Sequence, residues 1–218
     1  MDRYNMYAKD GSIHCIETHS SAVRDSRGQP DGAVVTFRTI DDEVRAENEL
    51  HRRATLDGLT GVLKREEVRA RLREMTANER HQGHRVGVLY VDLDGFKAIN
   101  DTYGHGAGDV VLRTFAGLLS DSVRQSDLVC RYGGEEFAFL FPESTVEQAH
   151  VLVERFRQRF AEHDIRLPDG LLVRVTLSIG LADASHCPLE IALQRADFAL
   201  YEAKRLGRNR VIVAADAD

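Results

Sequence analysis

Two short acidic segments of the chain carry residues of the kind that bind divalent metal ions. The first, residues 92–97, reads Asp-Leu-Asp-Gly-Phe-Lys and follows the apolar run at residues 86–91. A carboxylate at the end of a buried strand, such as that of Asp92, is held rigidly and suits Mg²⁺, which prefers oxygen ligands. Backbone N–H groups beside Gly95, together with the charge of Lys97, could cradle a phosphate group. The residues alone also fit a simpler role, in which the two aspartates cap the following helix.

The second segment, residues 131–137, reads Arg-Tyr-Gly-Gly-Glu-Glu-Phe. Its glycines, Gly133 and Gly134, predict a tight hairpin that a ligand can approach closely. The adjacent carboxylates of Glu135 and Glu136 repel each other, so the pair is more useful beside a divalent cation than as a source of stability. Neighbouring side chains in extended backbone diverge, so one can meet the metal while the other turns away. A Gly-Gly hairpin with two solvated glutamates is the alternative that the spacing leaves open.

The elements that must position these segments follow from the hydrophobic pattern after residue 57. Residues 171–181 alternate cleanly, with apolar side chains on one face of a strand. We expect a mixed central sheet flanked by helices, an α/β (α+β) sandwich of about 160 residues. The predicted helices are residues 66–82, a short one near Phe96, 108–123, 149–160 and 188–206, and the predicted strands are 86–91, 128–131, 137–141, 171–181 and 211–213.

The first part of the chain has a different pattern. Residues 1–40 predict short strands separated by turn signals at residues 9–12 and 25–32. Two or three such strands cannot bury a core alone, so we expect either a remnant of a larger domain or a segment that packs against something else. Residues 41–56 are polar and predict a helix with a thin apolar stripe. A solvated connector and a dimeric coiled-coil linker both fit this helix.

The composition excludes several classes of protein. The 218 residues are 43% hydrophobic and 29% charged, which is ordinary for a soluble globular protein. We expect no membrane segment, because no apolar run approaches about 20 residues. We expect no secretory signal, because no basic-then-apolar stretch opens the chain. A net charge of −6 disfavours a general nucleic-acid binder. The three cysteines are far apart, which predicts neither a disulfide framework nor a zinc site and suits the cytoplasm.

Five motifs, in order along the chain, resemble those of GGDEF domains, the diguanylate cyclases of bacterial signalling. They are Asp-Gly-Leu-Thr-Gly at 57–61, the 92–97 segment, the block Asn100-Asp101, Gly104-His105 and Gly108-Asp109, the 131–137 hairpin, and Tyr-x-Ala-Lys-x-x-Gly-Arg-Asn at 201–209. The resemblance covers about residues 54–214 and implies a fold like that of adenylyl cyclases and polymerase palms. Glu135 replaces the aspartate of the family's name and keeps the carboxylate.

The resemblance implies that the chain condenses two GTP molecules into cyclic di-GMP and releases pyrophosphate. Asp92, the Leu93 carbonyl and Glu135 would then hold Mg²⁺ or Mn²⁺. Glu135 would also be the general base with Glu136 as helper, and Lys97 would stabilise the transition state. The resemblance also implies that Asn100 and Asp109 contact guanine, with His105 contacting the substrate nearby. Around the phosphates it implies the backbone of Gly95, Phe96, Gly133 and Gly134 and the side chains of Lys97, Lys204 and Arg208.

The resemblance also implies regulation and assembly. Arg124 and Asp127 match the family's R-x-x-D product-inhibition site, with Arg155 as a weaker additional contact to cyclic di-GMP. A homodimer is implied, because two nucleotides must face each other.

Short phrases in residues 1–40 resemble the back half of a PAS sensor domain, so residues 41–56 would be a signalling linker and 57–214 the catalytic domain. A catalytically silent domain that binds GTP or cyclic di-GMP is the alternative, which the intact Glu135 and Glu136 disfavour. A third, weaker alternative is a related cyclase that uses another purine.

Overall fold

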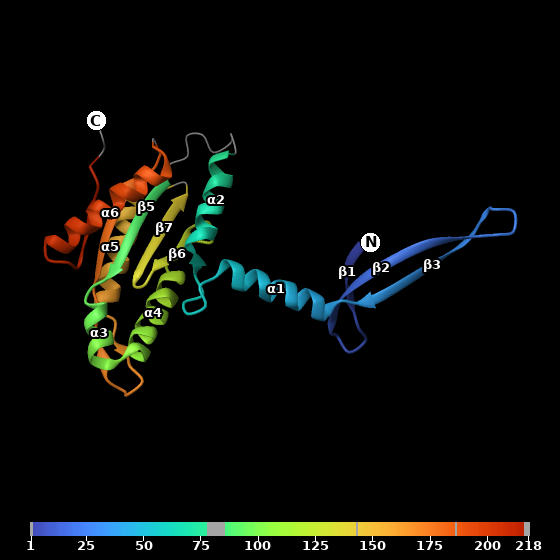
Figure 1. Cartoon of the computed structure of the whole chain (residues 1–218), viewed down its shortest axis with the longest axis horizontal. Coiled ribbons are helices and arrows are strands. Elements are labelled where there is room, and N and C mark those ends of the chain that lie inside the picture. The colour runs from blue at the N-terminus through green and yellow to red at the C-terminus, as the bar shows by residue number, and fades with distance from the viewer. Residues whose placement is uncertain (1, 78–85, 143, 186, 216–218) are drawn as a thin grey trace. The chain divides into compact units, whose positions relative to one another are not determined.

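The computed structural model describes residues 2–77, 86–142, 144–185 and 187–215. The chain divides into two compact units, Met1–Ala54 and Thr55–Asp218 (Figure 1). No described helix is long and apolar enough to cross a membrane.

The first unit is a three-stranded antiparallel sheet followed by a helix. Strands β1 (Asp2–Tyr7), β2 (Ile13–Arg24) and β3 (Pro30–Thr39) lie in the order β1-β2-β3, and α1 spans Asp41–Thr55. The β2–β3 pair is longer than the sequence pattern predicts, because pairing continues through a polar stretch in which Ser20 lies opposite Val35. Its core is small, with Ile16 and Ile40 as the buried apolar side chains among the described residues of the unit.

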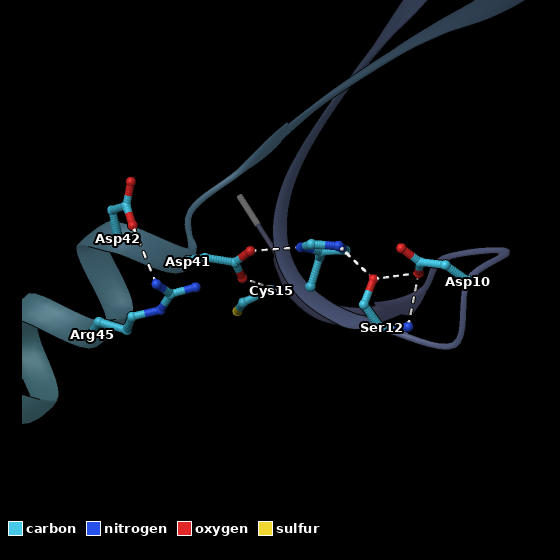
Figure 2. Close-up of polar contacts among 7 residues, drawn as sticks. Asp10, Ser12, Cys15, Asp41, Asp42 and Arg45 are labelled. Atoms are coloured by element: carbon cyan, nitrogen blue, oxygen red, sulfur yellow. Dashed lines mark hydrogen bonds and ion pairs between the residues drawn. The ribbon is translucent and has the colours of Figure 1, made fainter.

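A polar cluster ties the start of α1 to β2 (Figure 2). Asp41 accepts a hydrogen bond of 2.7 Å from the Cys15 backbone N–H, and its other oxygen lies 2.7 Å from Nδ1 of His14. The His14 contact, followed by the Cys15 bond, lowers the pKa of Asp41. Ser12 Oγ connects His14 Nε2, at 2.9 Å, with Asp10, at 2.6 Å. These contacts fix the first turn of α1 against the sheet.

The second unit contains a six-stranded mixed sheet in the order β11-β10-β5-β7-β6-β4. The β10–β11 and β4–β6 pairs are parallel, and the other neighbouring pairs are antiparallel. The strands are β4 (Leu63–Lys64), β5 (Val86–Leu93), β6 (Leu128–Gly133), β7 (Glu136–Pro142), β10 (Leu177–Asp183) and β11 (Arg210–Val213), while β8 (Ile165–Arg166) and β9 (Leu172–Val173) form a separate ribbon.

Helices cover both faces of this sheet (Figure 1). Leu89, Val91 and Leu93 of β5 pack with apolar residues of α4 (His105–Ser120) and α5 (Val146–Ala161). The alternate β5 residues Val88 and Tyr90 pack with α2 (Arg65–Ala77) and α6 (Leu189–Arg205). A short helix, α3 (Phe96–Tyr103), follows β5 directly. The predicted sandwich with a mixed sheet is therefore confirmed.

Two predicted elements were wrong in their bounds. The helix expected at 108–123 begins at His105 and ends at Ser120. The single strand expected at 171–181 is two strands, because Val173 pairs with β8 whereas Leu177 pairs with β5. Its apolar residues nevertheless share one cluster, as the alternation predicts. The helix expected at 66–82 spans Arg65–Ala77, and the part of that prediction beyond residue 77 lies outside the described residues.

Candidate active site

The last residues of β5 place a carboxylate on the face of the sheet that α6 covers. Asp92 follows Val88 and Tyr90 on that face, and only 8% of it is exposed. Its backbone lies opposite Glu136 of β7 and Ser178 of β10. The strand register therefore brings the first and second acidic segments together.

Asp92 carries an electrostatic cost that a bound cation would relieve. Burial is the main cause that raises the pKa of its carboxyl group, and the charges of Glu135 and Asp94 add to the effect. Nζ of Lys204, 2.7 Å from Asp92 Oδ2, acts in the opposite direction. The lysine of α6 thus partly compensates a buried carboxylate that has other carboxylates around it.

The hairpin between β6 and β7 presents the other two acids. Gly133 pairs with Glu136, so Gly134 and Glu135 form the turn, and Gly134 has a φ of 47°, which favours glycine. Burial raises the pKa of Glu136, and Asp92 is the next cause. The register places Asp92 opposite Glu136, and the charge of Glu135 is one of the causes that raise the pKa of Asp92, whereas the predicted meeting of Asp92 and Glu135 at a shared metal ion stays a prediction.

An ion pair that sequence analysis missed anchors this hairpin. Nη1 of Arg131 lies 3.2 Å from Asp57 Oδ1, and Nε of Arg131 donates a 2.9 Å hydrogen bond to the Gly134 carbonyl. Asp57 also accepts hydrogen bonds from the backbone N–H and the hydroxyl of Thr60. The 57–61 motif is therefore a turn that holds the arginine before the glycines. No local spacing pattern could have indicated this pair, because its two residues lie 74 positions apart.

The loop from β5 into α3 and α4 carries the residues implied for the nucleotide base. Gly95 has a φ of 72° and precedes the buried Phe96 at the start of α3. Gly108 of α4 packs so closely on α3 that a Cβ there would lie 2.1 Å from Oδ1 of Asn100. The structure thus brings Asn100 beside the backbone that carries Asp109. The half-exposed Asp109 carboxylate lies 3.6 Å from Nη2 of Arg113 on the same helix.

The basic residues implied for the phosphates come from three elements. Lys97 is exposed in the first turn of α3, and His105 is exposed at the start of α4. Lys204 lies in the last turn of α6, and Arg208 follows in a turn where its own φ is 63°. Lys204 is thus shown next to Asp92, while the contacts of Lys97 and His105 with a nucleotide stay predictions.

Arg124 and Asp127 form a compact turn beside a surface cavity. The Arg124 backbone N–H donates to Asp127 Oδ2 at 2.8 Å, and Asp127 N–H donates to the Arg124 carbonyl at 3.0 Å. Both residues line a cavity of about 420 Å³ together with Arg71. Arg155 lines a different cavity, of about 240 Å³, with Asp121 and Ser122. The first two predicted product-site residues therefore share a hollow, and the third does not line it.

The donor set fits a hard divalent cation. Among the described residues no three His, Cys, Asp or Glu side chains form a ready-made metal cluster. The predicted ligands are instead two carboxylates and the Leu93 carbonyl, which leave coordination positions for water and phosphate oxygens. Mg²⁺ is usually held in this way, by one or two carboxylates and the substrate.

Comparison with known proteins agrees with this fold. Residues 54–210 match the family model described as the diguanylate cyclase GGDEF domain. The chain therefore belongs to the GGDEF family of diguanylate cyclases.

Relatives and solved structures support that membership. The chain is 40% identical over 163 residues to the response regulator PleD of Caulobacter vibrioides, covering 73% of this chain and 36% of PleD. It is 40% identical over 157 residues to the diguanylate cyclase DosC of Escherichia coli, covering 72% of this chain and 34% of DosC. It thus spans about a third of the length of these relatives.

Among solved structures, the GGDEF domain of DgcB from Caulobacter crescentus in complex with c-di-GMP matches with a TM-score of 0.70 and 33% identity, covering 74% of this chain and 96% of that one. The active GGEEF domain of a diguanylate cyclase from Vibrio cholerae matches with a TM-score of 0.64 and 33% identity, covering 71% and 98%.

Proposed function

We propose that the chain is an active diguanylate cyclase that condenses two GTP molecules into cyclic di-GMP and pyrophosphate. The observation that carries the proposal is the meeting of the two acidic segments, with Asp92 opposite Glu136 and the Gly134–Glu135 turn beside them. Family membership supplies the reaction class. The residues that the reaction needs are all present in the unit that resembles the family.

In this proposal, Asp92, the Leu93 carbonyl and Glu135 hold Mg²⁺ or Mn²⁺. The ion, when bound, neutralises phosphate charge and lowers the pKa of the attacking 3′-hydroxyl. Glu135 accepts the proton from that hydroxyl, and the raised pKa of Glu136, caused mainly by burial, suits a helper in the same transfer. Lys97 stabilises the charge that develops on the phosphate in the transition state.

Asn100 and Asp109 are proposed to read the guanine base. Guanine offers N1–H and N2–H₂ donors that adenine lacks, and the Asp109 carboxylate can accept both. The close approach of Gly108 to Asn100 supports a shared role, because it holds the Asn100 amide next to the backbone of Asp109. His105, at the start of the same helix, is proposed to contact the substrate nearby.

Incubation of the protein with GTP and Mg²⁺, with products resolved by chromatography, tests the activity. We expect cyclic di-GMP from the unaltered protein and a loss of about 10²-fold or more for Asp92→Asn and Glu135→Gln, because these remove charge that the reaction needs. Asp164→Asn, at an exposed aspartate that pairs with the exposed Arg174, is the control and should keep full activity.

Binding of GTP without product, under conditions that allow dimerisation, would favour the silent receptor over the cyclase. Product from a purine nucleotide other than GTP would instead identify a related cyclase.

We also propose that cyclic di-GMP inhibits the enzyme at Arg124 and Asp127. The cavity that they share supports this, and arginine can bind guanine O6 and N7 as a fork. In titration calorimetry, Arg124→Ala should weaken cyclic di-GMP binding at least tenfold and remove product inhibition, with basal turnover kept. Equal inhibition of the unaltered protein and of Arg124→Ala by micromolar cyclic di-GMP would contradict an inhibitory site at Arg124 and Asp127. Arg155→Ala, from the separate cavity, measures whether that residue contributes.

Assembly and domain organisation complete the proposal. Each GTP needs a second GTP facing it, so the working form is a homodimer with one nucleotide in each half-site. Residues 1–40 are proposed to be the back part of a PAS-like sensor domain, 41–56 its signalling linker, and 57–214 the catalytic domain. Light scattering at increasing protein concentration, with and without GTP, tests the dimer.

A further inference from the structure

Asp94 is a buried carboxylate to which the activity proposed above assigns no role. It lies two residues after Asp92, and only 6% of its side chain is exposed. Oδ1 accepts a 2.6 Å hydrogen bond from the Ser178 hydroxyl, and Oδ2 accepts a 2.7 Å bond from Thr176. Oδ2 also accepts a 3.1 Å bond from the backbone N–H of Asn209. One carboxylate thus joins the end of β5, the start of β10 and the turn after α6.

The turn that Asp94 reaches has an unusual backbone. Gly207, Arg208 and Asn209 all have positive φ values, of 112°, 63° and 45°. The left-handed region is unfavourable for each residue that has a Cβ, because the Cβ approaches the following carbonyl oxygen. Such a conformation persists when surrounding contacts determine it. Here the Asn209 N–H donates to Asp94, and the Arg208 N–H donates to the Ala203 carbonyl at 3.0 Å.

The turn also sets the direction of Arg208. Nε of Arg208 lies 4.0 Å from Asp94 Oδ1, and one helical turn earlier Nζ of Lys204 lies 2.7 Å from Asp92. Lys204 therefore faces Asp92, and Arg208 faces Asp94. Among these four groups, Asp94 is the one that also holds the backbone of the turn through Asn209.

We propose that Asp94 is a positioning residue for the triphosphate: it holds residues 207–209 in their left-handed turn, so that Arg208 stands beside the phosphate-binding loop at Gly95. This inference rests on the proposed function, because it assumes that a nucleoside triphosphate binds there. Asp94 acts through Arg208 and is not expected to touch the substrate.

The test compares a ligand with phosphates and one without. The probes are 3′-deoxy-GTP, which lacks the attacking hydroxyl, and guanosine, each titrated with Mg²⁺ by calorimetry into the full chain. We expect Asp94→Asn to weaken 3′-deoxy-GTP about tenfold, because the charge that orients Arg208 is lost, and to leave guanosine within about twofold. Asp164→Asn, at an exposed aspartate outside the proposed sites, is the control and should change neither.

A double-mutant cycle with Arg208→Ala shows whether Asp94 acts through that arginine. We expect the double variant to bind 3′-deoxy-GTP no more weakly than Arg208→Ala alone, since the two residues act as one unit. Additive losses would overturn the inference, as would equal weakening of guanosine, which a general loss of structure would cause. Thr176→Val keeps the Asp94 carboxylate and removes one of its hydrogen-bond donors. It should weaken 3′-deoxy-GTP binding less than Asp94→Asn does, and it replaces that variant in the test if Asp94→Asn does not fold.

Failure of the proposed function and failure of the role of Asp94 give different results. If the unaltered protein does not bind 3′-deoxy-GTP, the proposed function fails and this inference fails with it. If the unaltered protein binds it and Asp94→Asn binds it equally well, only the role of Asp94 is overturned.

Discussion

Glycine at position 108 decides how closely two helices of the site approach. A Cβ there would lie 2.1 Å from Oδ1 of Asn100 and 3.0 Å from the ring of Phe96, so one side chain must shift if any atom is added. Asn100 is proposed to contact guanine, and Phe96 lies in the loop proposed to hold phosphates. A methyl group at position 108 would therefore displace residues of both the proposed guanine contact and the proposed phosphate loop.

We expect Gly108→Ala to lower stability by about 1–3 kcal/mol through overpacking and to raise the KM for GTP more than it lowers kcat. Urea unfolding and steady-state kinetics measure the two effects. Gly117→Ala in the same helix is the control, because nothing lies within 4 Å of its added Cβ. That variant should be more stable by about 0.5–1 kcal/mol, since alanine favours helix, and should keep its KM. An unchanged KM in Gly108→Ala would contradict the role of this contact.

At the scale of elements, residues 57–69 contact two neighbouring residues of the β6–β7 hairpin. Asp57 pairs with Arg131, and the guanidinium of Arg65 lies 4.2 Å from the ring centre of Tyr132. Arg69 donates a 3.3 Å hydrogen bond to the Tyr132 hydroxyl. The hairpin that carries Glu135 is therefore fixed by the turn at Asp57 and by α2 rather than by its own glycines.

The Asp57–Arg131 pair predicts a pH-dependent stability. Burial alone would raise the pKa of Asp57, but the Thr60 hydrogen bonds and the Arg131 charge together hold it below its usual value. A carboxyl whose folded pKa is lowered stabilises the fold above its unfolded pKa of about 3.9, and this contribution disappears as the pH falls through the folded pKa. Asp57→Asn should thus cost about 1–3 kcal/mol at pH 7, and less below about pH 4.

Urea unfolding at several pH values measures this difference. Asp164→Asn is the control, because Asp164 and its partner Arg174 are both largely exposed. An exposed pair contributes about 0–1 kcal/mol. A cost for Asp57→Asn that is the same at pH 3 and pH 7 would show that the charge of Asp57 is not what holds the hairpin.

Much of this arrangement was predictable from local pattern, and the rest was not. Apolar periodicity placed the long helices and the buried strands, since burial of one face repeats along the chain. It could not find β4, whose two residues pair in parallel with Cys130 and Arg131 far along the sequence. For Asp94, the residues of the 92–97 segment alone suggested a capping role. Its hydrogen-bond donors, Thr176, Ser178 and Asn209, are distant in the sequence and come together only in the folded chain.

At the scale of the whole molecule, the two units have separate interiors. Both apolar clusters of the second unit consist of residues from Leu59 onward. We therefore expect residues 55–218, produced alone, to fold and to unfold thermally within about 2 °C of the corresponding transition in the full chain. Calorimetry of both proteins measures this. A fragment that melts far below that transition would show that the first unit contributes to the stability of the second.

The sheet of the first unit leaves apolar side chains in water. Tyr4 and Met6 of β1 and Val35 and Phe37 of β3 share one face by the strand register, and between 38% and 66% of each is exposed. Within the described residues β1 and β3 are also the outer strands, with open edges. Exposed apolar edge strands can pair with other chains, so we expect concentrated samples to aggregate. Phe37→Lys should slow this aggregation.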